Sequence, residues 1–176
     1  VGVGSGVLYT ISDPTDGNTK QVLNVLALSN GEAKIVSSVE LMDGWATVLM
    51  DGTKAYVMAT QYPGSAMYDC NMRSSGSSDK GPTTDLWVLD LSDPANPKLV
   101  IAMRFEGSLS LNSVQAGHLV LTDNELSSVM IYSTENLPSL SFEAMVHITG
   151  YTQTVKVYRD AVFVCQGYYG VVGVGV

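Results

Sequence analysis

The stretch LWVLDLSDPANPKLV, residues 86–100, joins two apolar runs through a short segment that contains Ser-Asp-Pro and Asn-Pro. Both runs are short, rich in Leu and Val, and bounded by turn-forming residues, as is typical of β-strands. Because proline has no backbone N–H and a fixed φ, Pro94 and Pro97 hold the connection open and blunt the sheet edge beside it. The stretch therefore predicts an antiparallel strand, turn and strand.

The same pattern occurs two more times in the chain. Residues 23–44 and 128–150 repeat the order of strand, polar turn, strand and glycine, and each copy is accompanied by a second predicted hairpin. Asp90 and Tyr132, which occupy equivalent places, lie about 42 residues apart, close to the ~40–45 residues of a four-stranded propeller blade. The sequence thus predicts a repeated unit of four antiparallel strands. The additional hairpins are predicted at 45–60, 111–123 and 151–166.

The predicted fold class is all-β, a β-propeller built of four-stranded antiparallel blades. The Asp-Gly pairs at 15–18 and 50–53 favour tight hairpins, and since no window combines helical periodicity with helix caps, helix content should be very low. One domain is expected, with the first unit read as only three strands and the last as partial. The expected units are 1–42, 43–107, 108–150 and 151–176, with a loop insertion at 61–85 between the second and third strands of the second unit.

About three and a half blades do not close easily into a ring, because most propellers have about four to eight. We therefore expect the chain to be a segment of a larger propeller. The alternative is that its terminal strands combine into one shared blade and close a small ring.

Composition limits the possible partners. The 176 residues include 45% hydrophobic and 15% charged residues, which is enough apolar material for a core. The net charge of −8 and the scattered basic residues argue against nucleic acid as a partner. No apolar run approaches the ~20 residues of a spanning helix, so no membrane span is expected.

The segment DLWVLDLSDPANPKLV resembles the repeat of secreted and cell-surface β-propellers known as LVIVD-repeat proteins. The other two copies match less fully and retain only Pro138 of the two prolines. The resemblance implies a propeller in an extracellular, cell-surface or periplasmic location. The motif residues are Asp90, Ser92, Asp93, Pro94, Asn96 and Pro97. Glu106, Gly107 and Ser108 likewise resemble the link between blades in bacterial and archaeal secreted propellers.

Few residues suggest chemistry. His118 and His147 are predicted in different parts of their units, so neither a catalytic pair nor a metal site is expected, and no cofactor is predicted. The segment 13–18 lacks the alternating carboxylates of a calcium loop. Cys165 is expected as a buried strand residue, with a disulfide to Cys70 as the alternative.

The insertion is the predicted contact region, because it is rich in residue types common at interface centres. Two functions remain open. The chain is either a non-catalytic extracellular or periplasmic platform that binds protein or glycan through loops on one ring face, or an enzyme or cofactor binder whose central-channel site is completed by further blades. The predicted contact residues are Tyr62, Met67, Tyr68, Met72 and Arg73. The predicted channel residues, which lack a cluster of carboxylates or histidines and so favour the platform, are Thr47, Asn112, Ser113, Gln153 and Lys156.

Overall fold

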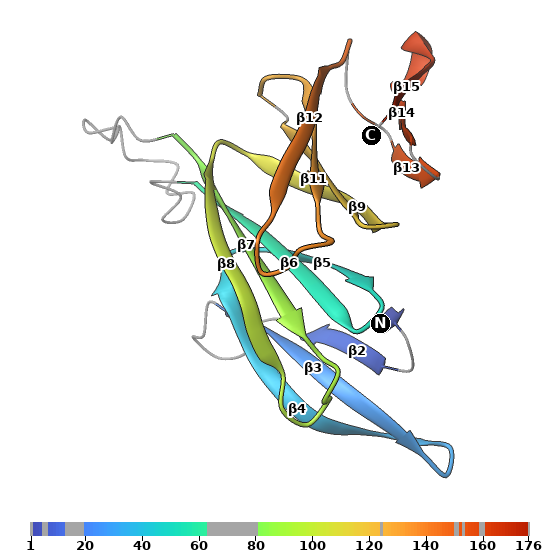
Figure 1. Ribbon diagram of the computed structural model, residues 1–176. Helices are drawn as coiled ribbons and strands as arrows, with labels where there is room; N and C mark the ends of the chain where they lie inside the picture. The colour runs from blue at the N-terminus through green and yellow to red at the C-terminus, as the bar shows by residue number, and fades with distance from the viewer. Residues whose placement is uncertain are drawn as a thin grey trace, which may run out of the picture.

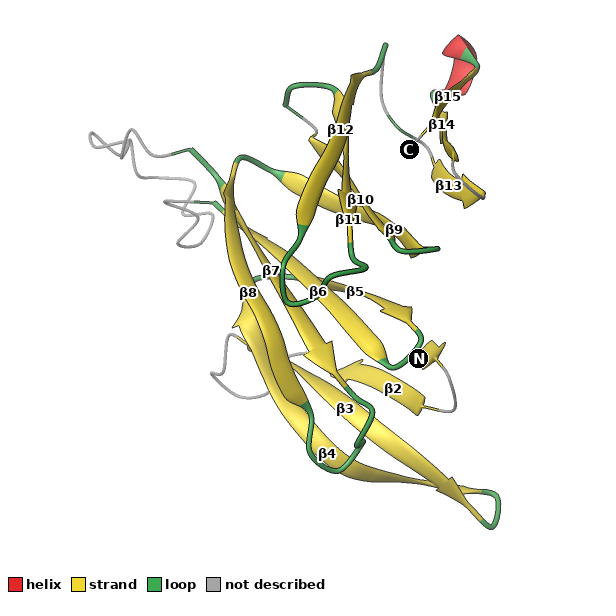
Figure 2. Ribbon diagram, in the orientation of Figure 1, coloured by secondary structure: helices red, strands yellow, loops and turns green. Residues whose placement is uncertain are grey.

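The computed structural model describes residues 2–4, 7–12, 20–62, 81–123, 125–149, 152, 154–158 and 161–175. This part of the chain is all-β, with one 3-10 turn, η1 (Gly167–Tyr169), as its sole helical element (Figure 2). The strands form four separate antiparallel sheets that follow one another in chain order (Figure 1). The all-β class and the very low helix content predicted from the sequence are confirmed.

Each sheet is a meander in which every strand pairs with the next. The first sheet contains β1 (Gly2–Gly4), β2 (Val7–Ser12), β3 (Lys20–Ser29) and β4 (Glu32–Asp43). The second contains β5 (Ala46–Asp51), β6 (Lys54–Gln61), β7 (Thr83–Asp90) and β8 (Lys98–Glu106). The third contains β9 (Leu109–Gln115), β10 (His118–Asp123), β11 (Ser128–Ser133) and β12 (Ser141–His147). The fourth contains β13 (Thr154–Tyr158), β14 (Ala161–Cys165) and β15 (Val171–Gly175).

The first sheet differs from its prediction. The sequence suggested three strands before residue 43, whereas the structure has four, because the three-residue β1 pairs with the start of β2. Gly4 lies opposite Val7, so the glycine-rich stretch contains a short hairpin rather than the beginning of one strand. With this strand counted, the first three sheets have the same four-stranded order.

Two-residue turns set the register of the hairpins. Asp51 pairs with Lys54 across Gly52, whose φ is +57°, which confirms the hairpin expected at 50–53. The turn between β9 and β10 uses Ala116 and Gly117, with φ values of +54° and +80°. Two consecutive positive φ values match the twist of antiparallel strands. The other predicted Asp-Gly turn, at 15–18, lies outside the described residues.

The core lies between the sheets, in three clusters that each join consecutive sheets. Strand β6 contributes to two of these clusters, because successive side chains of a strand point to opposite faces of the sheet. Ala55, Val57 and Ala59 pack toward the first sheet, while Tyr56 and Met58 pack toward the third. The second sheet is therefore buried on both faces, and its strands read as nearly continuous apolar runs.

Strand β14 shows how the last sheet differs. Val162 and Val164 are fully buried against the third sheet, whereas Phe163, between them, is 38% exposed. Within the described residues this second face of the fourth sheet has no apolar cluster against it. This alternation of buried and exposed side chains shows that the fourth sheet lies at one end of the stack formed by the described sheets.

The motif of residues 90–97, with its Ser-Asp-Pro and Asn-Pro, forms the turn between β7 and β8. The Asp90 carboxylate accepts a hydrogen bond from the Ser92 N–H at 2.9 Å, and the Asp93 carboxylate accepts from the Ala95 N–H at 3.1 Å and the Asn96 amide at 2.8 Å. The Pro94 carbonyl accepts a hydrogen bond from the Ser37 hydroxyl of β4. The polar residues of the motif therefore shape the turn and tie it to the neighbouring sheet.

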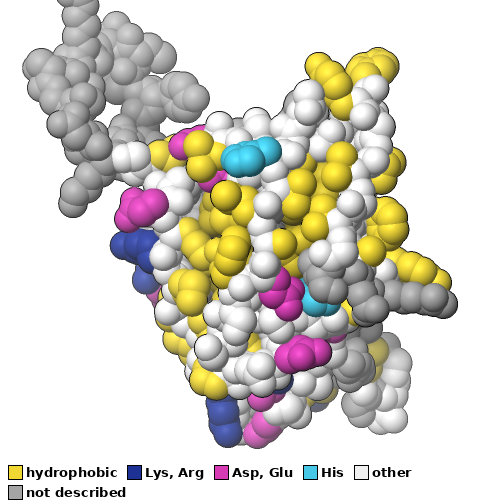
Figure 3. All heavy atoms as spheres, turned by 45° about the horizontal axis from the view of Figure 1, so that its top comes forward, with side chains coloured by type: hydrophobic (Ala, Val, Ile, Leu, Met, Phe, Trp, Pro, Cys, Tyr) yellow, Lys and Arg dark blue, Asp and Glu magenta, His cyan; other side chains and the backbone are white. Residues whose placement is uncertain are grey.

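The surface carries few basic groups. In the view of Figure 3, hydrophobic side chains gather over much of the forward face, acidic groups are scattered among them, and Lys and Arg lie at the margin. No helix in the described residues is long and apolar enough to span a membrane.

Candidate ligand-binding cleft

A cleft of about 660 Å³ lies where the second sheet meets the connections that enter and leave it. Its walls come from the start of β5, the end of β6 and the start of β9, together with the connection after β4. The aromatic and hydroxyl-bearing side chains of the lining are Trp45, Thr47, Thr60, Tyr62, Ser108 and Ser110. They form a cleft with two aromatic rings and several hydroxyl groups.

Two glycines direct the chain into the cleft from successive sheets. Gly44 has a φ of +97° and joins β4 to β5, and Gly107 has a φ of +93° and joins β8 to β9. Glycine adopts such values without the steric cost that a Cβ imposes. Trp45 and Ser108 each follow one of these glycines, so they occupy equivalent corners in consecutive units. A Cβ on Gly44 would also lie 3.2 Å from the Thr60 carbonyl oxygen.

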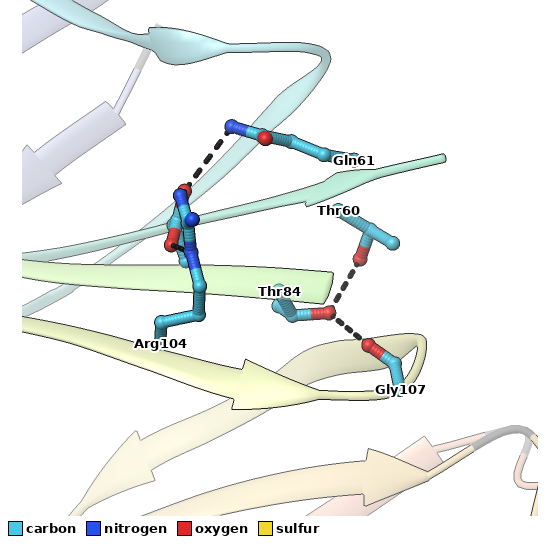
Figure 4. A network of polar contacts seen from close by, with 6 residues as sticks. Thr60, Gln61, Thr84, Arg104 and Gly107 are labelled. Atoms are coloured by element: carbon cyan, nitrogen blue, oxygen red, sulfur yellow. Dashed lines mark hydrogen bonds and ion pairs between the residues drawn. The ribbon is translucent and has the colours of Figure 1, made fainter. Parts of the chain in front are cut away.

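A buried hydroxyl group braces one wall of the cleft. Thr84 Oγ1 accepts a hydrogen bond from the Leu109 N–H at 3.0 Å and donates to the Gly107 carbonyl at 2.8 Å (Figure 4). Thr60 Oγ1 lies 2.9 Å from the same oxygen and 3.2 Å from the Leu109 carbonyl oxygen, so the two threonine hydroxyls and the carbonyls of Gly107 and Leu109 form one network. These hydrogen bonds hold the start of β9 against the end of β6 and the start of β7.

Next to this brace, Asp85 ties three strands together. Arg104, directly opposite on β8, donates from Nε at 2.6 Å and from an Nη at 2.7 Å to the two carboxylate oxygens. Gln61 Nε2, at the end of β6, donates to the same carboxylate at 3.1 Å (Figure 4). The hydrogen bond to Asp85 also raises the pKa of the Arg104 guanidinium. Gln61, the residue before Tyr62, is thus held by a carboxylate that the bidentate ion pair with Arg104 fixes in place.

The aromatic rings of the cleft are exposed. Trp45 has 79% and Tyr62 56% of its surface accessible. The Tyr62 hydroxyl lies 2.9 Å from Ser108 Oγ and so spans the cleft from the second sheet to the entrance of the third. Large apolar groups gain free energy when water is removed from them, so exposed rings beside a cleft provide binding surface for a partner.

The cleft is weakly acidic. Asp43 is the acidic residue of its lining, and no Lys or Arg is among the described lining residues. Lys20 pairs in register with Asp43 across β3 and β4, and its ammonium lies 2.8 Å from Glu40. The hydrogen bond from Lys20 to Glu40, with a smaller contribution from the Asp43 charge, raises the Lys20 pKa. Lys20 is thus shared between two carboxylates, and the three groups together keep a net negative charge at the rim.

The predicted contact residues are only partly within the described chain. Tyr62 lies in the cleft, but Met67, Tyr68, Met72 and Arg73 are outside the described residues. The insertion does leave between the second and third strands of its sheet, β6 and β7, as predicted, but the bounds 61–85 were too wide, because Gln61 ends β6 and residues 83–85 belong to β7. The predicted contact function of the insertion remains a prediction.

Of the predicted channel residues that the structure describes, Thr47 is the one that lines the cleft. Asn112 uses its amide to bond within the third sheet, to the Ser110 carbonyl and the Thr122 hydroxyl. Ser113 is half-buried on β9 and Lys156 is exposed on β13. Gln153 is outside the described residues.

The remaining candidates lie apart from the cleft. His118, expected on the turn between the first and second strands of its unit, is instead the first residue of β10, with Nδ1 2.8 Å from Glu143 Oε2. His147 ends the outer strand β12. Cys165 is a free thiol at the end of β14, a strand residue as expected but half-buried rather than buried. Cys70 and the segment 13–18 lie outside the described residues, so the disulfide alternative stays a prediction. In the described part of the chain, no three His, Cys, Asp or Glu side chains gather as metal ligands would.

Sequence reasoning missed Trp45, the most exposed aromatic residue of the cleft. It begins the hairpin predicted at 45–60 and belongs to no motif, so its role depends on the tertiary arrangement. The signal available was its place after a glycine at a unit boundary, as for Ser108 in the next unit. Exposed aromatic residues at such corners are candidates for binding.

Comparison with known proteins gives a likeness in fold. No protein-family model and no curated protein matches the chain. Among solved structures, the chain is similar to Kuenenia stuttgartiensis hydrazine synthase, with a TM-score of 0.63 and 11% sequence identity. The match covers 97% of this chain, which spans 56% of the matched one. At this identity the similarity concerns the fold alone.

Proposed function

We propose that this chain is a β-propeller or a segment of one, with blades of the LVIVD-repeat type. Three features support this architecture: the sheets are antiparallel meanders, they stack in chain order, and their first strands are neighbours. Strand β1 contacts β5, β5 contacts β9, and β9 contacts β13. First strands that lie side by side around an axis are the defining arrangement of a propeller.

We further propose that the protein is a non-catalytic platform that binds a partner outside the cytoplasm, at the cell surface or in the periplasm. The observation that carries this proposal is the exposed pair Trp45 and Tyr62 on a braced cleft. Tyr62 follows Gln61, which donates a hydrogen bond to the Asp85 carboxylate, and Trp45 precedes Ala46, whose N–H donates to Gln21 Oε1 at 2.7 Å. Rigid aromatic residues lose little conformational entropy on binding, so they suit a recognition surface.

The proposal is tested by measuring how the labelled protein binds to intact cells of its source and to their surface extracts. Wild type should bind saturably, and Trp45→Ala should reduce that binding by about tenfold or more. Tyr168→Ala removes another highly exposed aromatic residue, outside the cleft, and should bind as wild type does. Equal binding by all three proteins would contradict a role for the cleft.

A second measurement addresses the enzyme or cofactor alternative. Calorimetric titration of the full-length protein with Ca²⁺, Mg²⁺, Zn²⁺ and Mn²⁺ should show no tight stoichiometric uptake. Tight uptake by the native protein would count against a non-catalytic platform and favour a site completed in the central channel.

A further inference from the structure

We propose that the cleft between Trp45, Tyr62 and Ser108 binds a neutral saccharide, with one sugar ring packed on the Trp45 indole. This inference rests on the proposed binding function and specifies the ligand class of the same site. It follows from three properties of the cleft: its aromatic faces, its hydroxyl groups and its charge.

The aromatic faces select a ligand with an apolar ring face. The C–H bonds on one face of a pyranose carry a slight positive charge, whereas the face of an indole ring is negative. Stacking the two removes apolar surface from water and aligns these charges. Trp45 is 79% exposed at the edge of the cleft, so its ring is accessible to such a partner.

The hydroxyl groups select a ligand that both donates and accepts hydrogen bonds. Thr47 and Ser110 line the cleft, and Ser108 lies opposite Tyr62. Each hydroxyl has one hydrogen to donate and lone pairs that accept, as does each hydroxyl of a sugar. The capacity of such groups both to donate and to accept matches that of a polyhydroxylated ring.

The charges argue against an anionic ligand. No Lys or Arg lines the described cleft, so an anion would find no countercharge, and the chain as a whole carries a net charge of −8. A cation could use the aromatic faces and the Asp43 carboxylate, so choline is included among the probes as the cationic alternative.

The size of the cleft fits a short oligosaccharide. Its volume of about 660 Å³ lies within the range of roughly 300–1,000 Å³ found for small-molecule sites. The cleft extends from Trp45 after β4 to Ser110 in β9, so it joins two consecutive sheets. A ligand of more than one ring could therefore stack on Trp45 and reach the hydroxyl groups of the next unit.

The experiment uses cellotetraose, maltotetraose, mannotetraose and N,N′,N″,N‴-tetraacetylchitotetraose as neutral probes. Tetragalacturonate and choline serve as anionic and cationic probes. Binding is measured by calorimetry on the full protein and by tryptophan fluorescence of Trp87→Phe, in which Trp45 is the remaining indole. If that variant does not fold, calorimetry on wild type and Trp45→Ala decides the question alone.

At least one neutral tetrasaccharide should bind with saturation and change the Trp45 emission, while the charged probes should not bind. Trp45→Ala should weaken that affinity by about tenfold or more, and Tyr168→Ala should leave it unchanged. Binding of choline or tetragalacturonate alone, binding that survives Trp45→Ala, or no binding by any neutral probe would overturn the inference.

Failure of the saccharide inference is distinguishable from failure of the proposed function. Cell binding could depend on Trp45 and be inhibited by surface protein but by none of the saccharides. That result would support the proposed platform function and contradict the proposed ligand class. If cell binding itself does not depend on Trp45, the proposed function fails first.

Discussion

The hydroxyl of Tyr62 lies 2.9 Å from Ser108 Oγ, although the two residues are 46 positions apart in the sequence. Tyr62 follows the second strand of the second sheet, and Ser108 precedes the first strand of the third. This contact closes one side of the cleft and connects two consecutive units.

The Tyr62–Ser108 contact should give a small but measurable coupling. In a double-mutant cycle of Tyr62→Phe and Ser108→Ala, the coupling energy should be about 0.5–1 kcal/mol, because the pair is exposed and water replaces part of the bond. Urea unfolding of the four proteins provides the measurement. Strictly additive effects of the two substitutions would show that the contact contributes nothing in solution.

Thr84→Val should destabilise the protein by about 2–3 kcal/mol, because it preserves shape but leaves the Leu109 N–H and the Gly107 carbonyl without their partner. Thr84 is fully buried, so water cannot readily replace the hydroxyl. Thr84→Ser keeps the hydroxyl and serves as the control, with a smaller loss. Chemical unfolding compares the two, and equal losses would mean that the methyl group rather than the hydrogen bonds matters.

Ala116→Gly should stabilise the protein by about 1 kcal/mol, since Ala116 has a φ of +54°, where a Cβ is crowded by the backbone. Gly117→Ala in the same turn is the opposite case. Its φ is +80° and a Cβ there would lie 3.2 Å from Glu135 Cγ, so this change should destabilise. Thermal unfolding should move the two midpoints in opposite directions, and a lower midpoint for Ala116→Gly would refute the explanation.

The turn between β7 and β8 should contribute to stability against acid. The Ser92 N–H lowers the pKa of Asp90, and the Asn96 amide, followed by the Ala95 N–H, lowers the pKa of Asp93 below their ordinary value of 3.8. A lowered pKa in the folded state means that this stability is present above pH 3.8 and is lost as pH falls through the folded values.

The matching variants are Asp90→Asn, Asp93→Asn and the double substitution. The free energy of unfolding should fall less steeply below about pH 4 in each of them than in wild type, most clearly in the double variant. Urea unfolding at a series of pH values gives these slopes. An unchanged acid slope in the double variant would show that the two carboxylates are not linked to folding.

The sheets were largely predictable because their signals are local. Apolar runs such as those flanking Asp90, together with the Asp-Gly pair at 51–52, identify strands and hairpins without tertiary information. The predicted unit boundaries at 42/43 and 107/108 lie at the junctions between the observed sheets, within one residue of the end of β4 or β8. Strand β1 was missed because three residues containing two glycines carry little propensity for a strand.

The cleft was not predictable in the same way, because it depends on contacts between distant residues. Trp45, Tyr62 and Ser108 come from three separate connections, and no local pattern shows that these connections meet. Thr84 looks like an ordinary polar residue at a strand start, and its role appears only when Leu109 lies against it. Burial and hydrogen bonding across sheets supply this information.

The order in which the sheets stack is tested most directly by methyl NOEs in a protein labelled at Ala, Leu, Val and Met. The structure predicts cross-peaks between residues of consecutive sheets, such as Leu23 with Val57 and Met58 with Leu121, which share core clusters. It predicts none between Leu23 and Leu121, which belong to the first and third sheets. Cross-peaks between that last pair would indicate a two-layer sandwich and would contradict both the proposed propeller and the order of sheets on which the cleft depends.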